Sequence, residues 1–519
     1  MIPLFQKAAN VCVHCRNRKQ RCDRMLPQCD KCAAKKQACD YTPPVPSTVH
    51  KLEPLVIHHR SCGHADLSPY GAIELVQAVK ACIDAPLNSN LATDLLDLVS
   101  DVLGTVGFNL SDALTEFGPC IQQWCPILVE DHILGNCDYK VAEPVDAREG
   151  PQDPIIWMGL WLVLRSPCSP QEGMRRSELH ATLKQVHALW QYGLRLEIRS
   201  IQLGLLIAVF ELGHGQSQQA FQTLATCAAT LRCLELDAER RQEAGILKIM
   251  RWLKTSVAML DRQVCLSMVS DCLPLNLPPD HPVSKSLNRA LKSEYPQQPA
   301  RTSATSPWKV FVRTGVAIAA GNALGYVHSR QQGLEPYQSY DEVDASANLC
   351  ISMLVVKPTS PGMFHCDAVP MIFCSHILLQ TTQIQYLHAS HSTTSARESD
   401  YQKAVTALKF SRGMAWQMVR TALQLRSELS VSKTTFAGLC SVLRAGLAVL
   451  ESAKYVEDEV IEPGELDGYA RLLRSFAQRW PIGNEYIARA EKILGCGSYG
   501  TGDASERYLT QPFPVNVQN

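Results

Sequence analysis

Apolar side chains recur at intervals of three and four residues along most of the chain after residue 90. The clearest stretches are LATDLLDLVSDVL (91–103), LHATLKQVHALWQYGLRL (179–196), AFQTLATCAATLRCLEL (220–236) and YARLLRSFAQRW (469–480). This spacing puts the apolar side chains on one face of an α-helix, and alternating strand patterns are scarce. Proline and glycine interrupt the pattern at LPLNLPPDHP (273–282) and over 295–307. We therefore predict an all-α fold with a large helical body over residues 90–495.

The residues before this body follow a different pattern. YTPPVPSTVH (41–50) is rich in proline and lacks apolar periodicity, which predicts an extended linker, and we place this linker over residues 43–70. IELVQAVKACI (73–83) predicts an amphipathic helix, but no heptad repeat is sustained between residues 43 and 104, so a coiled coil is not expected there. At the other end, residues 497–519 are predicted to form a disordered tail.

Length and composition restrict the class of protein. A chain of 519 residues is too long for one core, and 46% hydrophobic with 19% charged residues is ordinary for a folded protein. The longest apolar runs, such as IIWMGLWLVL (155–164), are shorter than the ~20 residues that cross a bilayer. The first ten residues, MIPLFQKAAN, do not read as a secretory signal. We expect a cytosolic or nuclear protein that does not associate with membranes.

Charge and cysteine are unevenly distributed along the chain. The net charge is zero, yet residues 1–50 contain nine Lys and Arg against three Asp. A basic head on a mildly acidic body is typical of a nucleic-acid-binding module joined to a second domain. The chain has 21 cysteines, an odd number, and those beyond residue 40 are mostly scattered singly. We interpret these later cysteines as reduced thiols that serve as small apolar side chains.

Six cysteines in the head repeat one spacing, C-x2-C-x6-C, twice. They are Cys12, Cys15, Cys22, Cys29, Cys32 and Cys39. Two residues between cysteines let both sulfurs reach one cation from the first turn of a helix. One tetrahedral zinc would use four of the six, whereas two zincs need eight sulfur positions, which six cysteines supply only if two of them bridge. The repeat therefore favours two Zn²⁺ and six thiolates over unrelated thiols, a disulfide knot or a metal store.

The stretch CVHCRNRKQRCDRMLPQCDKCAAKKQAC (12–39) resembles the binuclear zinc-cluster DNA-binding domain of fungal transcription factors. On this resemblance we delimit the domain as residues 10–42. The resemblance implies that Cys12 and Cys29 bridge the two zincs and that the other four cysteines are terminal ligands. It also implies two short helices, which start near Cys12 and Cys29, and a connecting loop that turns at Pro27.

The same resemblance implies a mode of DNA binding. In that family the first helix presents its carboxyl end to the major groove, usually over a CGG triplet. By position, Lys19 is implied to contact a base, and Arg16, Arg18 and Arg21 to contact phosphates or the groove. The residue types agree, because Lys and Arg bind guanine O6 and N7 and phosphate oxygens. For Lys35 and Lys36, a solvated face and a phosphate contact remain equal alternatives.

Parts of the body resemble the middle homology region that follows the zinc cluster in many of these regulators. The segments are QQWCPIL (122–128), AVFELGHGQSQQAFQTLATCAATLRCLELD (208–237), AMLDRQVCL (258–266) and LPLNLPPD (273–280). They occur in the family's order, so we interpret residues 90–495 as a helical regulatory domain of this kind.

Other candidate chemistry in the body is weak. His58, His59, Cys62 and His64 fit no closed zinc site, and His214 between two glycines has no evident nucleophile or acid beside it. Trp124, Trp157, Trp161 and Trp252 lie in apolar stretches and are expected in the core. The sequence contains no glycine-rich phosphate loop after a strand and no H-E-x-x-H motif. We therefore predict no catalytic residues and no cofactor other than zinc.

These observations lead to one main functional hypothesis and two alternatives. The main hypothesis is a nuclear, sequence-specific transcription factor that binds CGG-type half-sites in double-stranded DNA. Family habit suggests RNA polymerase II genes of a metabolic or secondary-metabolite gene cluster as its targets, and a homodimer through the helical body is possible. In the first alternative the helical body binds a small-molecule effector or catalyses a reaction. In the second, the chain is a metal-storage or scaffold protein without a DNA target.

Overall fold

A computed structural model of the chain describes most of the helical residues and leaves several connections out. The described residues are 8, 11–18, 20–26, 28–39, 66–84, 91–122, 124–128, 153–164, 177–192, 197–242, 244–268, 273–294, 306–355, 367–389, 395–425, 436–458, 460–462 and 464–496. The chain divides into two compact units, Met1–Cys62 and Gly63–Asn519. Most of the predicted linker and the predicted tail over 497–519 lie outside the described residues.

The first unit contains two short helices, α1 (Val13–Asn17) and α2 (Asp30–Ala33). Each begins directly after a cysteine of the motif, as the family resemblance implied. The backbone N–H of Gln20 donates to the carbonyl of Cys15 at 2.9 Å, and the N–H of Gln37 donates to that of Cys32, 17 residues further on, at 2.9 Å. The repeat in the sequence is therefore also a repeat in the structure.

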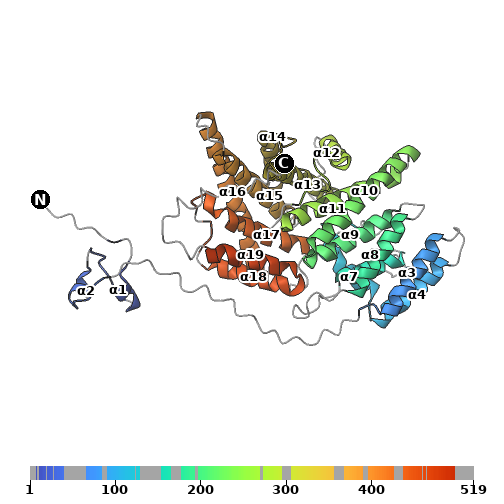
Figure 1. Cartoon of the computed structure of the whole chain (residues 1–519), viewed down its shortest axis with the longest axis horizontal. Coiled ribbons are helices and arrows are strands. Elements are labelled where there is room, and N and C mark those ends of the chain that lie inside the picture. Colours follow the sequence, from blue (N-terminus) through green and yellow to red (C-terminus); the bar gives the residue numbers. More distant parts are fainter. Residues whose placement is uncertain are drawn as a thin grey trace, which may run out of the picture. The chain divides into compact units, whose positions relative to one another are not determined.

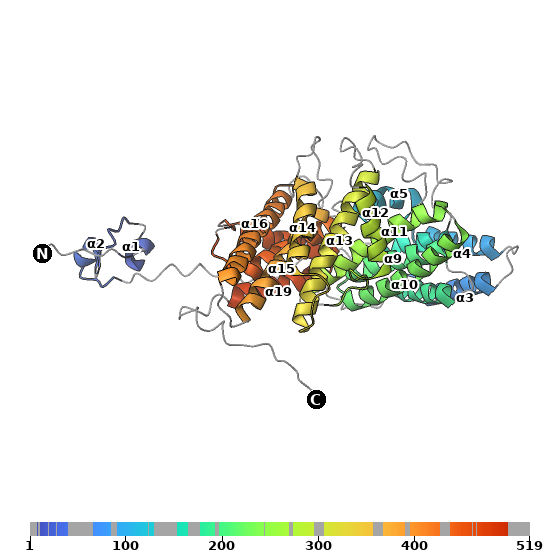
Figure 2. The same cartoon turned by 90° about the horizontal axis from the view of Figure 1, so that it is seen from above.

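The described part of the second unit consists of helices, with no β-strand among its described residues. Figures 1 and 2 show these helices packed against one another, with α11, α13 and α15 near the middle of the unit. In chain order they are α3 (Pro69–Asp84), α4 (Leu91–Thr105), α5 (Leu110–Phe117), η1 (Gly118–Gln122), α7 (Pro154–Leu164), α8 (Glu178–Tyr192), α9 (Ile198–Gly213), α10 (Ser217–Arg241), α11 (Ala244–Ser267), α12 (Pro282–Glu294), α13 (Ser306–Gln331), α14 (Tyr340–Val355), α15 (Ala368–Ala389), α16 (Ser395–Leu425), α17 (Phe436–Ser452), η6 (Ala453–Tyr455), α18 (Glu465–Arg479) and α19 (Ile482–Cys496).

The all-α prediction is confirmed, and the four most periodic stretches correspond to α4, α8, α10 and α18. The described part of the break at 273–282 is non-helical as far as His281. Two boundaries differ from the sequence prediction. α13 begins at Ser306, just inside the second predicted break. The helix predicted over 73–83 is α3, which packs on α4 and α8, so the helical unit begins earlier than residue 90.

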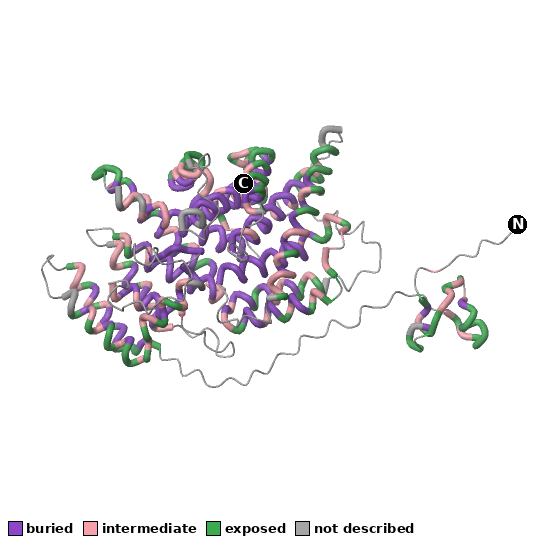
Figure 3. Tube along the Cα trace, turned by 180° about the vertical axis from the view of Figure 1, so that it is seen from behind, coloured by how far each residue is buried: buried purple, intermediate pink, exposed green. Residues whose placement is uncertain are grey.

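The central helices are buried on all sides. Leu203 to Gly213 of α9 are all buried, and α17 is buried along nearly its whole length (Figure 3). A helix that is apolar all round belongs in the core of a large unit. Val310–Gln331 and Phe436–Tyr455 are long and apolar enough to span a bilayer, yet 89% of each 18-residue window is buried inside the unit. Packing against neighbouring helices therefore accounts for their composition.

Two of the segments that resemble the middle homology region bind each other. Asp261 on α11 accepts hydrogen bonds from the backbone N–H groups of Asn276 and Leu277, at 3.1 and 3.3 Å. Arg262 donates from Nη2 to the carbonyl of Leu277 at 2.7 Å. Gly321 on α13 leaves room for this guanidinium, since a Cβ there would lie 2.5 Å from Nη2. The buried side chains of Asp261 and Arg262 thus hold the non-helical segment around Leu277 against α11.

A buried polar network joins α14, α15 and α16. Asp344 Oδ1 lies 2.9 Å from His376 Nε2 and accepts from Gln380 Nε2 at 2.7 Å, and Asp344 Oδ2 accepts from Asn348 Nδ2 at 3.0 Å. His376 Nδ1 lies 2.7 Å from Ser411 Oγ. The Asp344 carboxylate therefore accepts hydrogen bonds from three side chains on α14 and α15. His376 extends the network to α16 through Ser411.

Replacing Asp344 with Ala should destabilise the helical unit. The change leaves His376 and Gln380 buried without their acceptor, which costs about 3 kcal/mol of unfolding free energy. Guanidinium titration followed by far-UV circular dichroism measures it. Asp341→Ala is the matched control, because Asp341 is 80% exposed and its ion pair with Lys403 is on the surface; its effect should stay below about 1 kcal/mol. Equal effects of the two substitutions would contradict this account.

Candidate metal centre and DNA interface

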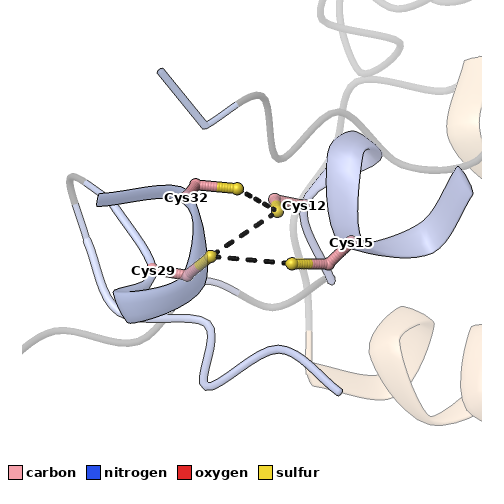
Figure 4. A group of neighbouring side chains, drawn as sticks. All are labelled: Cys12, Cys15, Cys29 and Cys32. Carbon is pink, nitrogen blue, oxygen red and sulfur yellow. Dashed lines mark hydrogen bonds between the residues drawn. The ribbon is translucent and has the colours of Figure 1, made fainter. Parts of the chain in front are cut away.

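The cysteines of the head are positioned by the starts of α1 and α2. Cys29 is the N-cap of α2, with extended backbone angles (φ −74°, ψ 151°), and Cys32 lies in the first turn of the same helix. Cys12 and Cys15 stand in the same relation to α1. A spacing of three residues across a helix start brings two side chains to the same side. Each half of the repeat therefore presents a pair of sulfurs (Figure 4).

The two pairs face each other at distances that suit a metal. Cys12 Sγ lies 3.8 Å from Cys29 Sγ and 3.7 Å from Cys32 Sγ, and Cys15 Sγ lies 3.7 Å from Cys29 Sγ. All four sulfurs lie within 4.8 Å of one another. Four thiolates at ~2.3 Å from one tetrahedral zinc lie about 3.8 Å apart. The observed spacing fits that ligand set.

The remaining two cysteines complete the group. Cys22 Sγ lies 3.9 Å from Cys12 Sγ, and Cys39 Sγ accepts the backbone N–H of Cys29 at 3.2 Å. Cys12 and Cys29 therefore lie at the centre of the group and contact sulfurs from both halves. This is the position that bridging ligands require.

Burial of these thiols favours their protonated form when no cation is present. Cys12 and Cys29 are 0% exposed, Cys15 and Cys32 are 3% exposed, and burial raises the pKa of all four thiols. Burial opposes ionisation of Cys22 too, but hydrogen bonds with the backbone of Cys12 and Arg24 help to lower its pKa. A divalent cation reverses this preference and displaces the protons. Metal binding should therefore weaken as the pH falls.

A comparison with known protein families matches this group of residues. The profile of the fungal Zn(2)-Cys(6) binuclear cluster domain family matches residues 10–47. Residues 10–47 are a fungal Zn(2)-Cys(6) binuclear cluster domain. Such a domain binds two zinc ions through six cysteines, and the convergence of the sulfurs agrees with this. No curated protein and no solved structure matches the chain.

The domain assigns the chain to a broad functional class. Proteins with this domain are DNA-binding transcription regulators, typically not enzymes and generally nuclear. In the zinc-cluster domain of this chain, Arg18 and Arg21 are exposed just after α1. The side chain of Arg16 and all of Lys19 and Pro27 lie outside the described residues. Lys35 and Lys36 are exposed beyond α2.

The other residues singled out from the sequence form no second site within the part of the chain that the structure describes. His58, His59, Cys62 and His64 lie outside the described residues. His214 stacks on Phe210, with ring centroids 3.9 Å apart, and its Nδ1 lies 2.8 Å from the Phe210 carbonyl oxygen. Trp124 and Trp161 are buried, and Trp157 and Trp252 are half-buried. These side chains belong to the packing of the helical unit.

Asp23 is the residue of the zinc-cluster domain that sequence reasoning missed. It lies within the cysteine-rich stretch 12–39, which assigns it no role, yet its Oδ2 accepts the backbone N–H of Asp30 at 3.1 Å. This hydrogen bond, with another from the backbone of Met25, lowers the pKa of Asp23 despite some desolvation. The available signal was its place in the repeat, because an Asp follows the third cysteine of both units, as Asp23 and Asp40.

The zinc-cluster domain should fold only with metal. Its buried core consists of cysteines, and zinc–thiolate bonds contribute ~10–16 kcal/mol in small zinc peptides. We expect a 1–62 fragment to carry two zinc ions by native mass spectrometry and to lose its helical circular dichroism on chelation. The control is the full chain, whose helical signal should persist in the chelator. A stoichiometry of one, or a fragment that stays folded without zinc, would contradict this expectation.

Proposed function

We propose that this chain is a nuclear, sequence-specific transcription factor whose zinc-cluster domain binds CGG-type elements in the major groove. The observation that carries the proposal is the family match on a domain whose six cysteines converge beside exposed arginines. Its targets are RNA polymerase II genes, of a metabolic or secondary-metabolite gene cluster by analogy with the family. The basic head and the mildly acidic body are consistent with a head that binds DNA and a body that does not.

The six cysteines hold two zinc ions in this proposal. Cys12 and Cys29 bridge, which is supported by their central position and their complete burial. Cys15, Cys22, Cys32 and Cys39 are the terminal ligands. When bound, the zinc ions supply structure, because they hold α1 and α2 at fixed positions relative to each other. Substituting Cys12 or Cys29 would therefore disturb both metal positions, and substituting a terminal cysteine would disturb one.

DNA recognition is assigned to the basic residues at the carboxyl end of α1. Lys19 reads base edges, and Arg16, Arg18 and Arg21 contact phosphates or the groove wall. The exposure of Arg18 and Arg21 supports their availability for an anionic partner. Base contacts confer specificity, whereas phosphate contacts confer affinity that depends on salt.

Lys19→Ala should lower discrimination for CGG, and Arg21→Ala should not. Loss of a base-edge contact costs about 1–3 kcal/mol of specificity. Loss of a phosphate contact weakens binding to all sequences and reduces its salt dependence. Fluorescence anisotropy with CGG and scrambled duplexes at several salt concentrations separates the two effects. An unchanged specificity ratio in Lys19→Ala would refute the assignment of Lys19. A native chain that does not bind either duplex would favour a metal-storage role.

A second copy of the chain is the partner that would supply further specificity. One head reads only a few base pairs, which is little among the ~10⁶–10⁹ competing sites in a genome. The linker carries Pro43, Pro44 and Pro46 without heptads, so pairing through the body is the remaining route to a dimer. Large apolar side chains in the described part of the body that are 43–71% exposed support this: Tyr70, Ile73, Leu236, Leu334, Tyr337, Leu349, Tyr386 and Phe410.

The full chain should therefore dimerise and the head alone should not. Sedimentation velocity of the full chain and of residues 1–62 measures the oligomeric state, and gel shifts on duplexes with one or two CGG triplets measure cooperativity. We expect cooperative occupancy of paired sites only for the full chain. Dimerisation of the short fragment, or equal cooperativity of the two proteins, would place the contact in the head instead.

One arrangement of side chains in the body is relevant to the alternative function, catalysis. Asp344, His376 and Ser411 form a hydrogen-bonded series of the residue types used by hydrolases. His376 and Ser411 are 0% exposed and Asp344 is 5% exposed, so a substrate would not reach the serine hydroxyl in this conformation. The series is better explained as the network that joins α14, α15 and α16.

A further inference from the structure

Asp23 links the two halves of the zinc-cluster domain through a hydrogen bond to the backbone of Asp30. It follows Cys22 directly, and its Oδ2 accepts the N–H of Asp30, seven residues later, at 3.1 Å. Asp30 is the first residue of α2, and the N-cap of that helix, Cys29, makes no side-chain capping bond. A carboxylate from the preceding loop therefore satisfies one of the backbone N–H groups at the start of α2 that have no partner within the helix.

This bond fixes two cysteines as well as a helix end. Cys22 precedes Asp23 and Cys29 precedes Asp30, so the bond closes a short loop with one cysteine at each end. The sulfurs of Cys22 and Cys29 and a carboxylate oxygen of Asp23 all lie within 4.8 Å of one another. Loss of the bond would free the loop that carries Cys22 from the start of α2.

The other carboxylate oxygen is also informative. Asp23 Oδ1 is buried and has no hydrogen-bond partner among the described residues. A buried polar atom without a partner costs free energy, so an apolar side chain would serve better if this position only filled space. The carboxylate group is therefore explained by the hydrogen bonds that it accepts from the backbone of Asp30 and Met25, and the bond from Asp30 is the one that reaches α2.

We propose that Asp23 is a positioning residue of the zinc cluster: its carboxylate caps α2 and holds Cys22 next to Cys29. Groups that orient metal ligands without binding the metal typically change metal affinity 10–100-fold when they are removed. Asp23 therefore controls how long the cluster retains zinc, without being a ligand. This inference rests on the zinc cluster alone and does not require that the chain binds DNA.

The test is the rate at which the full-length, zinc-loaded protein releases metal to a chromogenic chelator. Asp23→Ala removes the acceptor and should release zinc 10–100-fold faster than the native chain. Asp23→Asn keeps an acceptor, since Asn caps helices about as well as Asp, and should stay within about threefold of the native rate. Gln20→Ala, at an exposed position beside α1, is the control and should not change the rate.

Two further readouts decide between positioning and the other possible roles. Cobalt-substituted Asp23→Ala should keep the visible spectrum of the native cobalt protein, whereas a changed spectrum would identify Asp23 as a ligand and overturn the proposal. A native release rate in Asp23→Ala, or equally fast release in Asp23→Asn, would also overturn it. If Asp23→Ala is purified with fewer than two zinc ions while Asp23→Asn keeps both, the proposal is supported. The control is the thermal unfolding midpoint of the helical body, which should be the same in Asp23→Ala as in the native chain.

Discussion

The convergence of six sulfurs on the Cys12–Cys29 pair is the constraint on which the rest of the first unit depends. α1 has five residues and α2 has four, far too few for helices that persist alone in water. Among the described residues of this unit no apolar cluster compensates, because their buried core is made of cysteine. The metal–thiolate bonds must therefore stabilise both helices and fix the direction in which α1 presents Arg18 and Arg21.

The helical unit is held together by different physical terms. Its central helices are buried on all sides, so apolar burial dominates, and buried arginines are matched to carboxylates and backbone carbonyls. Arg313 contacts Asp367 through two hydrogen bonds of 2.9 Å, and Arg412 contacts Asp458 through two of 2.8 Å. Neither pair involves a thiolate. Metal loss should consequently unfold the first unit and leave the helical unit folded. The helical unit can therefore serve as the internal control in experiments that remove zinc.

The sequence contained enough to predict the cysteine cluster and the amphipathic helices, because both follow from local spacing. The stretches 91–103 and 220–236 lie inside α4 and α10. Contacts between distant residues could not be predicted this way. Two partners of His376, for example, are Asp344 and Ser411, which are 32 and 35 residues away in the sequence. No pattern near any of these three residues reveals the contact. Periodicity shows that one face of a helix is buried, but it does not show which neighbouring helix covers that face. The packing of α3 against α8 could therefore not be predicted from the sequence.

The crowding of basic residues between Cys15 and Cys22 also follows from the cluster. Two divalent cations with six thiolates form an anionic group, which offsets part of the repulsion among these basic residues. Arg18 and Arg21 are exposed, and in the proposed function they contact phosphates or the groove. If DNA binds only the metal-loaded domain, as proposed, then DNA and zinc stabilise the same folded state. By mass action, DNA present at 100 times its dissociation constant would add about 2.7 kcal/mol to the stability of that state. A regulator bound to its site would therefore retain zinc longer than the free protein.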